Sequence, residues 1–295
     1  MGARMPGILG RLLDTRSDTV ILLRRNRKIK AGALLLGAIL LVAFIGPYTA
    51  RYGPLEYTGD IGAPPSIEHP LGTNTFGYDV YSQTVYGLRS SIVIGLLGGV
   101  LATLIGVVIG FLSGYFGGVV DEVLMMLTNI FLVIPTLALL IIIAAYIEQR
   151  GIAIESIIIG ATSWPWTARA IRANTLSLRN REFVHTAKVS GEGTITIVVR
   201  EIAPNMLSYI IMVFILQFGG AILYAVGLDF IGLGPTKGIS LGVVLQQAVL
   251  WNAIQLGMWW WAIPPGLLIA LLLTSLYVIN TGLDEVLNPR LRRVG

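Results

Sequence analysis

Long apolar runs, separated by charged or glycine-rich stretches, most constrain the fold of this 295-residue chain. A helix that crosses a bilayer needs about 20 predominantly apolar residues. We predict six spans, at residues 31–46, 90–116, 121–146, 152–168, 206–231 and 255–283. Only 13% of the residues are charged, whereas a soluble domain carries roughly 25%. The predicted fold class is therefore an all-α integral membrane protein.

The apolar runs and the polar stretches between them predict the domain organisation. The predicted parts are a basic N-terminal segment (1–30), a first transmembrane helix (31–50), an external loop (51–88), a core with five transmembrane helices (89–284) and a cytoplasmic tail (285–295). A cytoplasmic loop at 169–205 interrupts the core. The first run is too long for the apolar region of a signal peptide and ends at Pro47, so we expect it to be retained. Residues 240–251 are apolar but too short to span, which predicts a partial helix.

Small and aromatic residues predict how the spans pack and bend. Gly106, Gly110 and Gly114 recur at four-residue spacing, so they share one helix face where another helix can approach closely. Pro135 predicts a kink in the third span. Trp259–Trp261 are expected at the membrane interface, where indole rings gather.

The basic residues predict how the chain is oriented. With six spans, 17 of the 21 lysines and arginines fall on one side of the membrane, and only Arg51, Arg89, Arg150 and Lys237 fall on the other. Cytoplasmic segments carry such an excess of basic residues. The sequence therefore predicts cytoplasmic N- and C-termini. Orientation in the membrane also explains the net charge of +5 better than nucleic-acid binding does.

The longest polar interruption lies at residues 179–205. Apolar residues recur at helical spacing in 182–189 and again in 194–203, which predicts two short amphipathic helices. Gly191 is expected to turn the chain between them, and Pro204 is expected to stop the second. Two short helices joined by a glycine turn form a knob that another protein could grip. A polar loop lying on the bilayer surface is the alternative.

The polar side chains provide little catalytic chemistry. The chain has no cysteine and no G-x-x-x-x-G-K-[ST] phosphate loop, and its two histidines, His69 and His185, are far apart, so no catalytic or metal site is predicted. Charges within the spans are almost absent. Asp229 is the nearest candidate, and both a gate and simple placement at the membrane interface fit its position near the outer end of the fifth span. Gln217 and Asn280 could line a pathway, although hydrogen bonding between helices is their commoner role.

The polar loop contains His185-Thr186-Ala187, then Gly191, then Ala203-Pro204-Asn205, and in this order it resembles the cytoplasmic loop of ABC importer permeases. That loop has the pattern Glu-Ala-Ala, three residues, Gly, and a hydrophobic stretch that ends in Leu-Pro. Here His185-Thr186-Ala187 stands at the Glu-Ala-Ala position, Gly191 at the glycine and Ala203-Pro204-Asn205 at the end. His185 and Thr186 differ from the residues that give the pattern its name.

Other motifs resemble the dipeptide, oligopeptide and nickel subfamily of these permeases. They are HPLGTN from His69, GYDV from Gly77, GYFGG from Gly114, the pair Asp121-Glu122, FIGLG from Phe230 and NPRLR from Asn288. The similarity covers about residues 20–293 and indicates the C-type permease subunit. It implies the type I importer permease fold, with six transmembrane helices and a cytoplasmic coupling loop, in a prokaryotic cell membrane.

The resemblance also implies a function and a set of partners. The implied function is to form half of the pathway of an ATP-driven importer of di- or oligopeptides, with ATP and Mg²⁺ bound by partner subunits and no cofactor in this chain. The implied partners are a homologous B-type permease, two ATP-binding subunits, an extracytoplasmic substrate-binding protein and membrane lipid. The implied coupling residues are Glu182, His185, Thr186, Ala187, Ser190, Gly191 and Pro204, and the possible pathway or gate residues are Gln217, Asp229 and Asn280.

Two alternatives stay open at this point. Relatives within the subfamily carry oligosaccharides or nickel, so the substrate class is undecided. A membrane-embedded enzyme or assembly factor is the alternative from another class, but it would need polar groups in the spans, and few exist.

Overall fold

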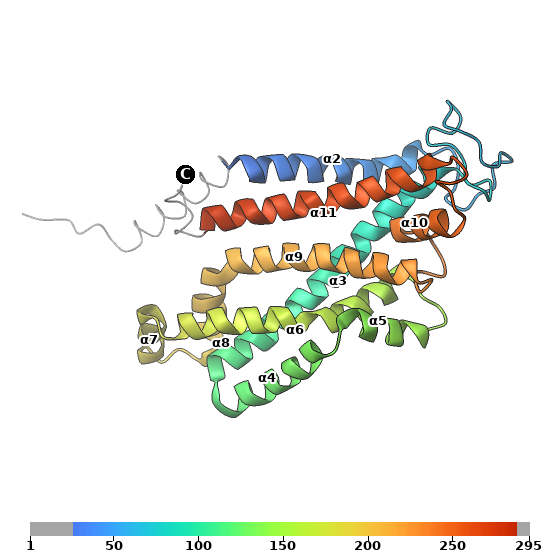
Figure 1. The fold of residues 1–295 in the computed structure, drawn as a ribbon. Helices are drawn as coiled ribbons and strands as arrows, with labels where there is room; N and C mark the ends of the chain where they lie inside the picture. The colour runs from blue at the N-terminus through green and yellow to red at the C-terminus, as the bar shows by residue number, and fades with distance from the viewer. Residues whose placement is uncertain (1–25, 288–295) are drawn as a thin grey trace, which may run out of the picture.

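The computed structural model describes residues 26–287, and most of them are helical (Figure 1). The helices are α2 (Arg27–Thr49), α3 (Val80–Phe116), α4 (Gly118–Val133), α5 (Thr136–Ala145), α6 (Ile152–Arg179), α7 (Glu182–Val189), α8 (Thr194–Ile197), α9 (Ala203–Phe230), α10 (Leu241–Leu250) and α11 (Trp259–Leu287). A π-helical turn, Val198–Ile202, joins α8 to α9. The all-α prediction is confirmed, since residues 26–287 contain isolated β-bridges but no strand. Most of the basic N-terminal segment and most of the tail lie outside the described residues.

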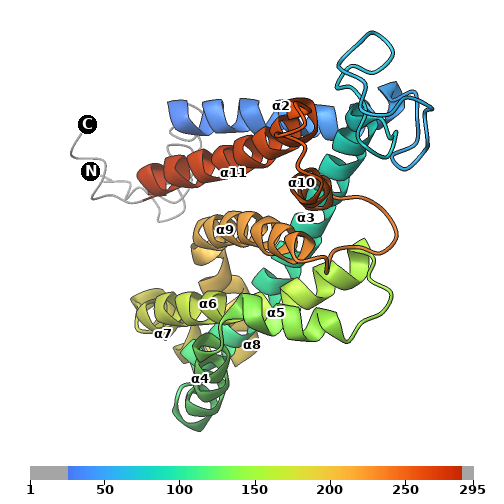
Figure 2. The same ribbon diagram turned by 45° about the vertical axis from the view of Figure 1, so that its right-hand side comes forward.

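The helices form a layered bundle in which α3 crosses the others (Figure 1). Helices α2 and α11 run side by side, and the most extensive pairing joins α3 to α6. Helix α10 contacts α11, α3 and α9, and Figure 2 shows it between α11 and α9. Helix α7 lies at one end of the bundle, whereas α10 and the loop before α3 lie at the other.

Four helices of the described chain are long and apolar enough to cross a membrane. They are Arg27–Thr49, Val80–Phe116, Thr194–Phe230 and Trp259–Val286. Helices α4 and α5 pass the same test only together, and they are bent by 82° at the break that contains Pro135, where a kink was predicted. Helix α6, the predicted fourth span, has 28 residues, but Glu155, Arg169, Arg172 and Arg179 make it less apolar than these.

Close packing of α3 on α6 follows from the glycine stripe. A Cβ atom on Gly106 would lie 2.5 Å from the Cβ atom of Thr167, and one on Gly110 would lie 2.6 Å from that of Ile171. Gly114 is equally close to α6. Real Cβ contacts are longer, so only glycine allows this helix separation. The prediction that these glycines bring another helix close is confirmed.

The predicted external loop, 51–88, is shorter than expected. Helix α3 begins at Val80, ten residues before the predicted span, because the Asp79 carboxylate accepts a hydrogen bond from the Ser82 amide and caps the helix. Residues before Val80 pack against the start of α11. There the Trp260 indole donates to the Thr73 carbonyl over 3.1 Å, and Trp261 is buried. Of the three tryptophans expected at the membrane interface, only Trp259 is exposed.

Pro204 does not stop a helix, contrary to the prediction. Helices α8 and α9 form one continuous span, Thr194–Phe230, and the π-helical turn precedes the proline. The Ala203 amide donates to the Val198 carbonyl, five residues back. Proline has no amide hydrogen to donate, so the wider turn lets the helix pass it.

Candidate functional site

Helix α7 is seated on the bundle by one apolar face. Val184 is fully buried and Ala187 nearly so, which matches the predicted amphipathic helix over 182–189. They belong to a core cluster that includes Tyr115 of α3, Ile171 of α6 and Met206 of α9. Helix α7 itself contacts α8 and the π-helical turn before α9, and it shares this core cluster with three long helices.

The opposite face of α7 is exposed and polar. Glu182, His185, Thr186 and Ser190 lie on it, while Ala187 lies on the buried face. The Thr186 hydroxyl donates to the Glu182 carbonyl (3.0 Å), and the Ser190 hydroxyl donates to the Thr186 carbonyl (2.9 Å). These two hydroxyl groups therefore bind carbonyl groups of their own helix. Pro204 lies apart from them, exposed at the start of α9.

Gly191 ends α7 in a conformation that favours glycine. Its φ is +79°, in the left-handed region that other residues rarely adopt. Its amide donates to the Lys188 carbonyl, and the Glu192 amide donates to the Ala187 carbonyl, both over 3.1 Å. This pair of bonds is the Schellman motif, which satisfies the last carbonyl groups of a helix. A Cβ atom at Gly191 would meet nothing within 4 Å, so backbone conformation, not space, explains the glycine.

Two charge-based contacts join the helix ends near α7. The Lys188 ammonium lies 5.4 Å from the centre of the Tyr115 ring, a cation–π distance. The Arg172 guanidinium of α6 makes two 2.5 Å bonds to the Asp121 carboxylate of α4, and the Ser113 hydroxyl donates to the same carboxylate. Sequence reasoning missed the Asp121–Arg172 pair, although opposite charges stand at the ends of neighbouring spans.

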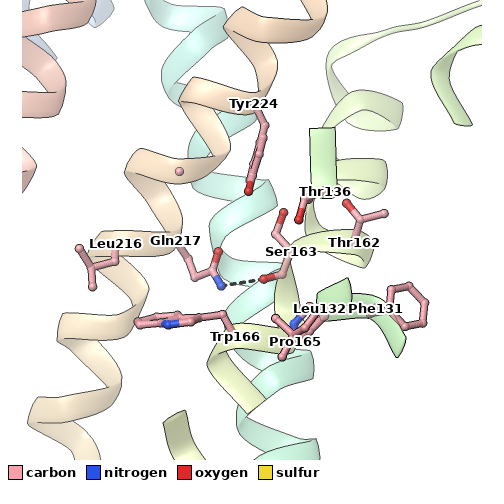
Figure 3. A pocket seen from close by; sticks show the side chains of 11 residues that line it. Phe131, Leu132, Thr136, Thr162, Ser163, Pro165, Trp166, Leu216, Gln217 and Tyr224 are labelled. Carbon is pink, nitrogen blue, oxygen red and sulfur yellow. Dashed lines mark hydrogen bonds between the residues drawn. The ribbon is translucent and has the colours of Figure 1, made fainter. Parts of the chain in front are cut away.

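A cavity of about 260 Å³ lies at the level of the α4–α5 break. Its lining comes from α4, α5, α6 and α9, and Figure 3 shows Trp166, Tyr224 and Gln217 around it. The other lining residues are Phe131, Leu132, Thr136, Thr162, Ser163, Pro165, Leu216 and Gly220. The lining thus combines aromatic rings with hydroxyl and amide groups and contains no charged side chain.

Gln217 both lines this cavity and joins two helices. Its amide nitrogen donates to the Ser163 carbonyl over 2.9 Å, as Figure 3 shows, and to the Thr167 hydroxyl over 2.7 Å, so that it ties α9 to α6. Gln217 thus makes the interhelical hydrogen bonds that the sequence named as its commoner role, and it lines the cavity as well.

The other two pathway candidates lie elsewhere. Asp229 is buried at the end of α9, where its carboxylate accepts a hydrogen bond from the Ser240 hydroxyl over 2.6 Å. Asn280 lies on α11, outside the cavity lining. The structure therefore does not bring the three candidates together. It also shows a buried carboxyl that the sequence reading passed over, Glu155 of α6, although an acidic residue in an apolar run is a visible signal.

Comparison with known proteins identifies a matching family and similar sequences. The binding-protein-dependent transport system inner membrane component family matches residues 106–293. The dipeptide transport system permease protein of Bacillus subtilis is 30% identical over 273 residues, which cover 92% of this chain and 84% of the relative. The oligopeptide transport system permease protein of Mycobacterium bovis is 30% identical over 289 residues, which cover 95% and 98%.

A solved structure shares the fold. The chain resembles one in inward-facing structures of the MetNI methionine ABC transporter, with a TM-score of 0.52 and 18% identity, covering 72% of this chain and 96% of that one. This likeness concerns the fold alone, and the sequence relatives place the chain within a family. The chain belongs to the family of inner membrane components of binding-protein-dependent transport systems, the permeases of ABC importers.

Proposed function

We propose that this chain forms half of the translocation pathway of an ATP-driven importer of di- and oligopeptides. A permease of this family is a transport component rather than an enzyme, and it works with ATPase and permease subunits. The proposed partners are a homologous B-type permease, two ATP-binding subunits and an extracytoplasmic substrate-binding protein. ATP and Mg²⁺ belong to the ATP-binding subunits in this proposal, and this chain needs no cofactor.

The seating of α7 is the observation that carries the proposal. A short helix with a buried apolar face and an exposed polar face, in contact with the π-helical turn that leads into α9 and in one core cluster with α3, α6 and α9, suits the transfer of an external push to whole helices. Packed interiors resist local compression and pass displacement to neighbouring elements. A partner that grips Glu182, His185, Thr186 and Ser190 would therefore move the bundle rather than α7 alone.

The Gln217 cavity is the proposed contribution of this subunit to the pathway. Its hydroxyl and amide groups can exchange hydrogen bonds with the amide groups of a peptide, and its rings can pack against side chains. In this proposal a facing permease subunit completes the enclosure. Peptide, rather than oligosaccharide or nickel, is proposed because the relatives named above are dipeptide and oligopeptide permeases.

The proposed orientation places α7 and both termini in the cytoplasm. The chain has no cysteine, so single cysteines can be introduced without background. Cysteines at the exposed positions Ser66, Gln149 and Lys237 are expected to react with an impermeant reagent applied outside. A cysteine at exposed Glu192 is expected to react only after permeabilisation. Outside labelling at position 192 would refute this topology.

The functional test has two parts, both in cells that make the chain in its native membrane. Cells from which the chain is deleted are expected to lose uptake of labelled dipeptides. A tagged full-length chain is expected to copurify with ATP-binding subunits. Hydrolysis of ATP should accompany the complex and be absent from the chain purified alone. Unchanged uptake of dipeptides and of longer peptides after deletion would contradict the substrate class. Robust hydrolysis by the isolated chain would contradict the division of labour.

A further inference from the structure

Two carboxyl groups are buried together at the end of the bundle opposite α7, and the proposed coupling uses neither. Glu155 lies in the first turn of α6 and Asp229 in the last turn of α9. The residues are 3% and 1% exposed. Ile158, three residues after Glu155, and Leu228, next to Asp229, belong to one core cluster. They therefore share one buried environment contributed by two helices.

Most of their oxygen atoms have no hydrogen-bond partner in the described part of the chain. One Asp229 oxygen accepts from the Ser240 hydroxyl, but the other, and both oxygens of Glu155, have none. Gly234 and Gly242 leave room for the Asp229 carboxyl, since Cβ atoms there would fall 2.0 and 2.2 Å from its oxygens. The Asp229 carboxyl is thus enclosed by two glycines and has the Ser240 hydroxyl as its donor.

One positive charge lies beside the two carboxyl groups. It belongs to Arg150, which precedes α6 and whose side chain bonds to Gly234, the residue that packs against the Asp229 carboxyl. However, the Arg150 guanidinium donates its hydrogen bonds to backbone carbonyls, including those of Ile147 (2.8 Å) and Gly234 (3.1 Å). Two ionised carboxylates would therefore leave a net negative charge in a buried place.

Other charged or titratable groups on the surrounding elements point elsewhere. Glu148 and Lys237 are exposed on the neighbouring loops. Arg89 of α3 is exposed and lies over the ring of Phe44. Tyr224 of α9 lines the Gln217 cavity. None of these groups balances the pair.

We propose that Glu155 and Asp229 form a buried proton-binding site that holds one proton between them. An isolated buried carboxylate is costly, and such groups become neutral instead. Two carboxyl groups that share a site do not both ionise readily. One proton leaves one carboxylate opposite Arg150, so the charges balance. The protonated group also gains an O–H donor for one of the oxygens without a partner.

The site lies where several connections meet. The Thr236 amide donates to the Arg150 carbonyl (2.7 Å), and the Leu241 amide donates to the Ser91 hydroxyl (3.0 Å). Loss of the proton would place an unbalanced charge beneath these connections and loosen them. The proton-binding site stands without the proposed function, whereas any effect of its titration on transport rests on that function.

Infrared spectroscopy tests the proposal, because a protonated carboxyl group has its own carbonyl stretching band. Spectra of the wild type and of each variant are compared, with every protein studied as the full chain in lipid nanodiscs. We expect this band at neutral pH in the wild type and its loss in both Glu155→Gln and Asp229→Asn. Either substitution leaves a single carboxylate opposite Arg150. The matched control is Glu148→Gln, which changes an exposed carboxyl in the adjoining turn and should keep the band.

Thermal unfolding across pH gives a second measurement. Ordinary carboxyl groups are ionised at neutral pH, so the unfolded chain releases the proton that the folded chain holds. The stability of the folded chain then falls as pH rises above the range in which ordinary carboxyl groups titrate. This loss of stability should be smaller in both single variants than in the wild type and in Glu148→Gln.

Three outcomes would overturn the proposal. The first is a wild type without the band at neutral pH. The second is a band that persists in both single variants. The third is stabilisation of the wild type by added Na⁺ or Ca²⁺ in place of the band, which would identify a metal ion as the occupant.

Discussion

Replacement of Gly191 by valine tests whether the turn after α7 is a working part of the coupling loop. A residue other than glycine in the left-handed region costs about 1–2 kcal/mol, and strained backbone positions cost roughly 1–3 kcal/mol. The structure adds no steric cost, because a Cβ atom at Gly191 meets nothing within 4 Å. The expected penalty is therefore about 1–3 kcal/mol, which changes the ratio of native to altered turn by roughly 5–150-fold.

The penalty should be confined to the end of α7. The two Schellman bonds would be lost with the turn, whereas Val184 and Ala187 would still anchor the first part of the helix. Membrane insertion should be unchanged, because Gly191 lies outside every span. Peptide uptake and the amount of ATPase that copurifies should both fall. Gly191→Asn should have a smaller effect, since asparagine tolerates the left-handed region better than valine does.

Gly193 provides the matched control. It lies two residues away in the same loop, but its φ of −68° and ψ of 151° suit any residue. The only neighbour within reach of its Cβ atom is the Thr196 hydroxyl, at 4.0 Å. The Gly193→Val variant is therefore expected to match the wild type in membrane insertion, in the amount of ATPase that copurifies and in peptide uptake. Equal defects in the two valine variants, or normal transport in Gly191→Val, would refute the backbone argument.

Two further predictions concern the long helices. Gly110→Val should destabilise the α3–α6 interface by about 1–3 kcal/mol through overpacking, because its Cβ atom would lie 2.6 Å from that of Ile171. The control is Gly37→Val, because a Cβ atom at Gly37 meets nothing within 4 Å, and it should leave the thermal unfolding temperature of the purified chain unchanged. Equal shifts of that temperature in the two valine variants would contradict the overpacking argument. Arg172→Ala should cost about 1.5–3 kcal/mol because it leaves the Asp121 carboxylate without its charged partner. Arg172→Lys should recover only part of that loss, since an ammonium group cannot make the two-bond contact, and full recovery in the same assay would argue against a role for the bidentate geometry.

The sequence predicted elements that depend on local pattern. Helix α7 has the predicted bounds, because the helical spacing of its apolar residues can be seen within its own eight residues. The stripe of Gly106, Gly110 and Gly114 likewise encodes a close contact without revealing the partner. Hydropathy failed at helix ends. It marks the apolar stretch, whereas α3 and α6 continue through polar residues as helices, one to its Asp79 cap and the other to Arg179.

Features that depend on tertiary contact could not be read from the sequence. Asp121 and Arg172 are 51 residues apart, and nothing local signals that they meet. Trp260 was expected at the membrane interface because indoles gather there, but the residues before α3 provide it with a backbone acceptor and cover it. Glu155 is the instructive case. Its position in an apolar run is visible, but its meaning depends on Asp229 and Arg150.

The same packing that seats α7 limits how the molecule can respond to a push. Tyr115 and Ile171, which share a core cluster with α7, belong to α3 and α6, and the glycine stripe holds these two helices in close contact from Gly106 to Gly114. Interiors packed this closely move as units rather than deform continuously. The 82° break between α4 and α5 is the place where the wall of the Gln217 cavity is not a continuous helix. A displacement of α7 should therefore carry α3 and α6 as one body and change the cavity mainly at that break.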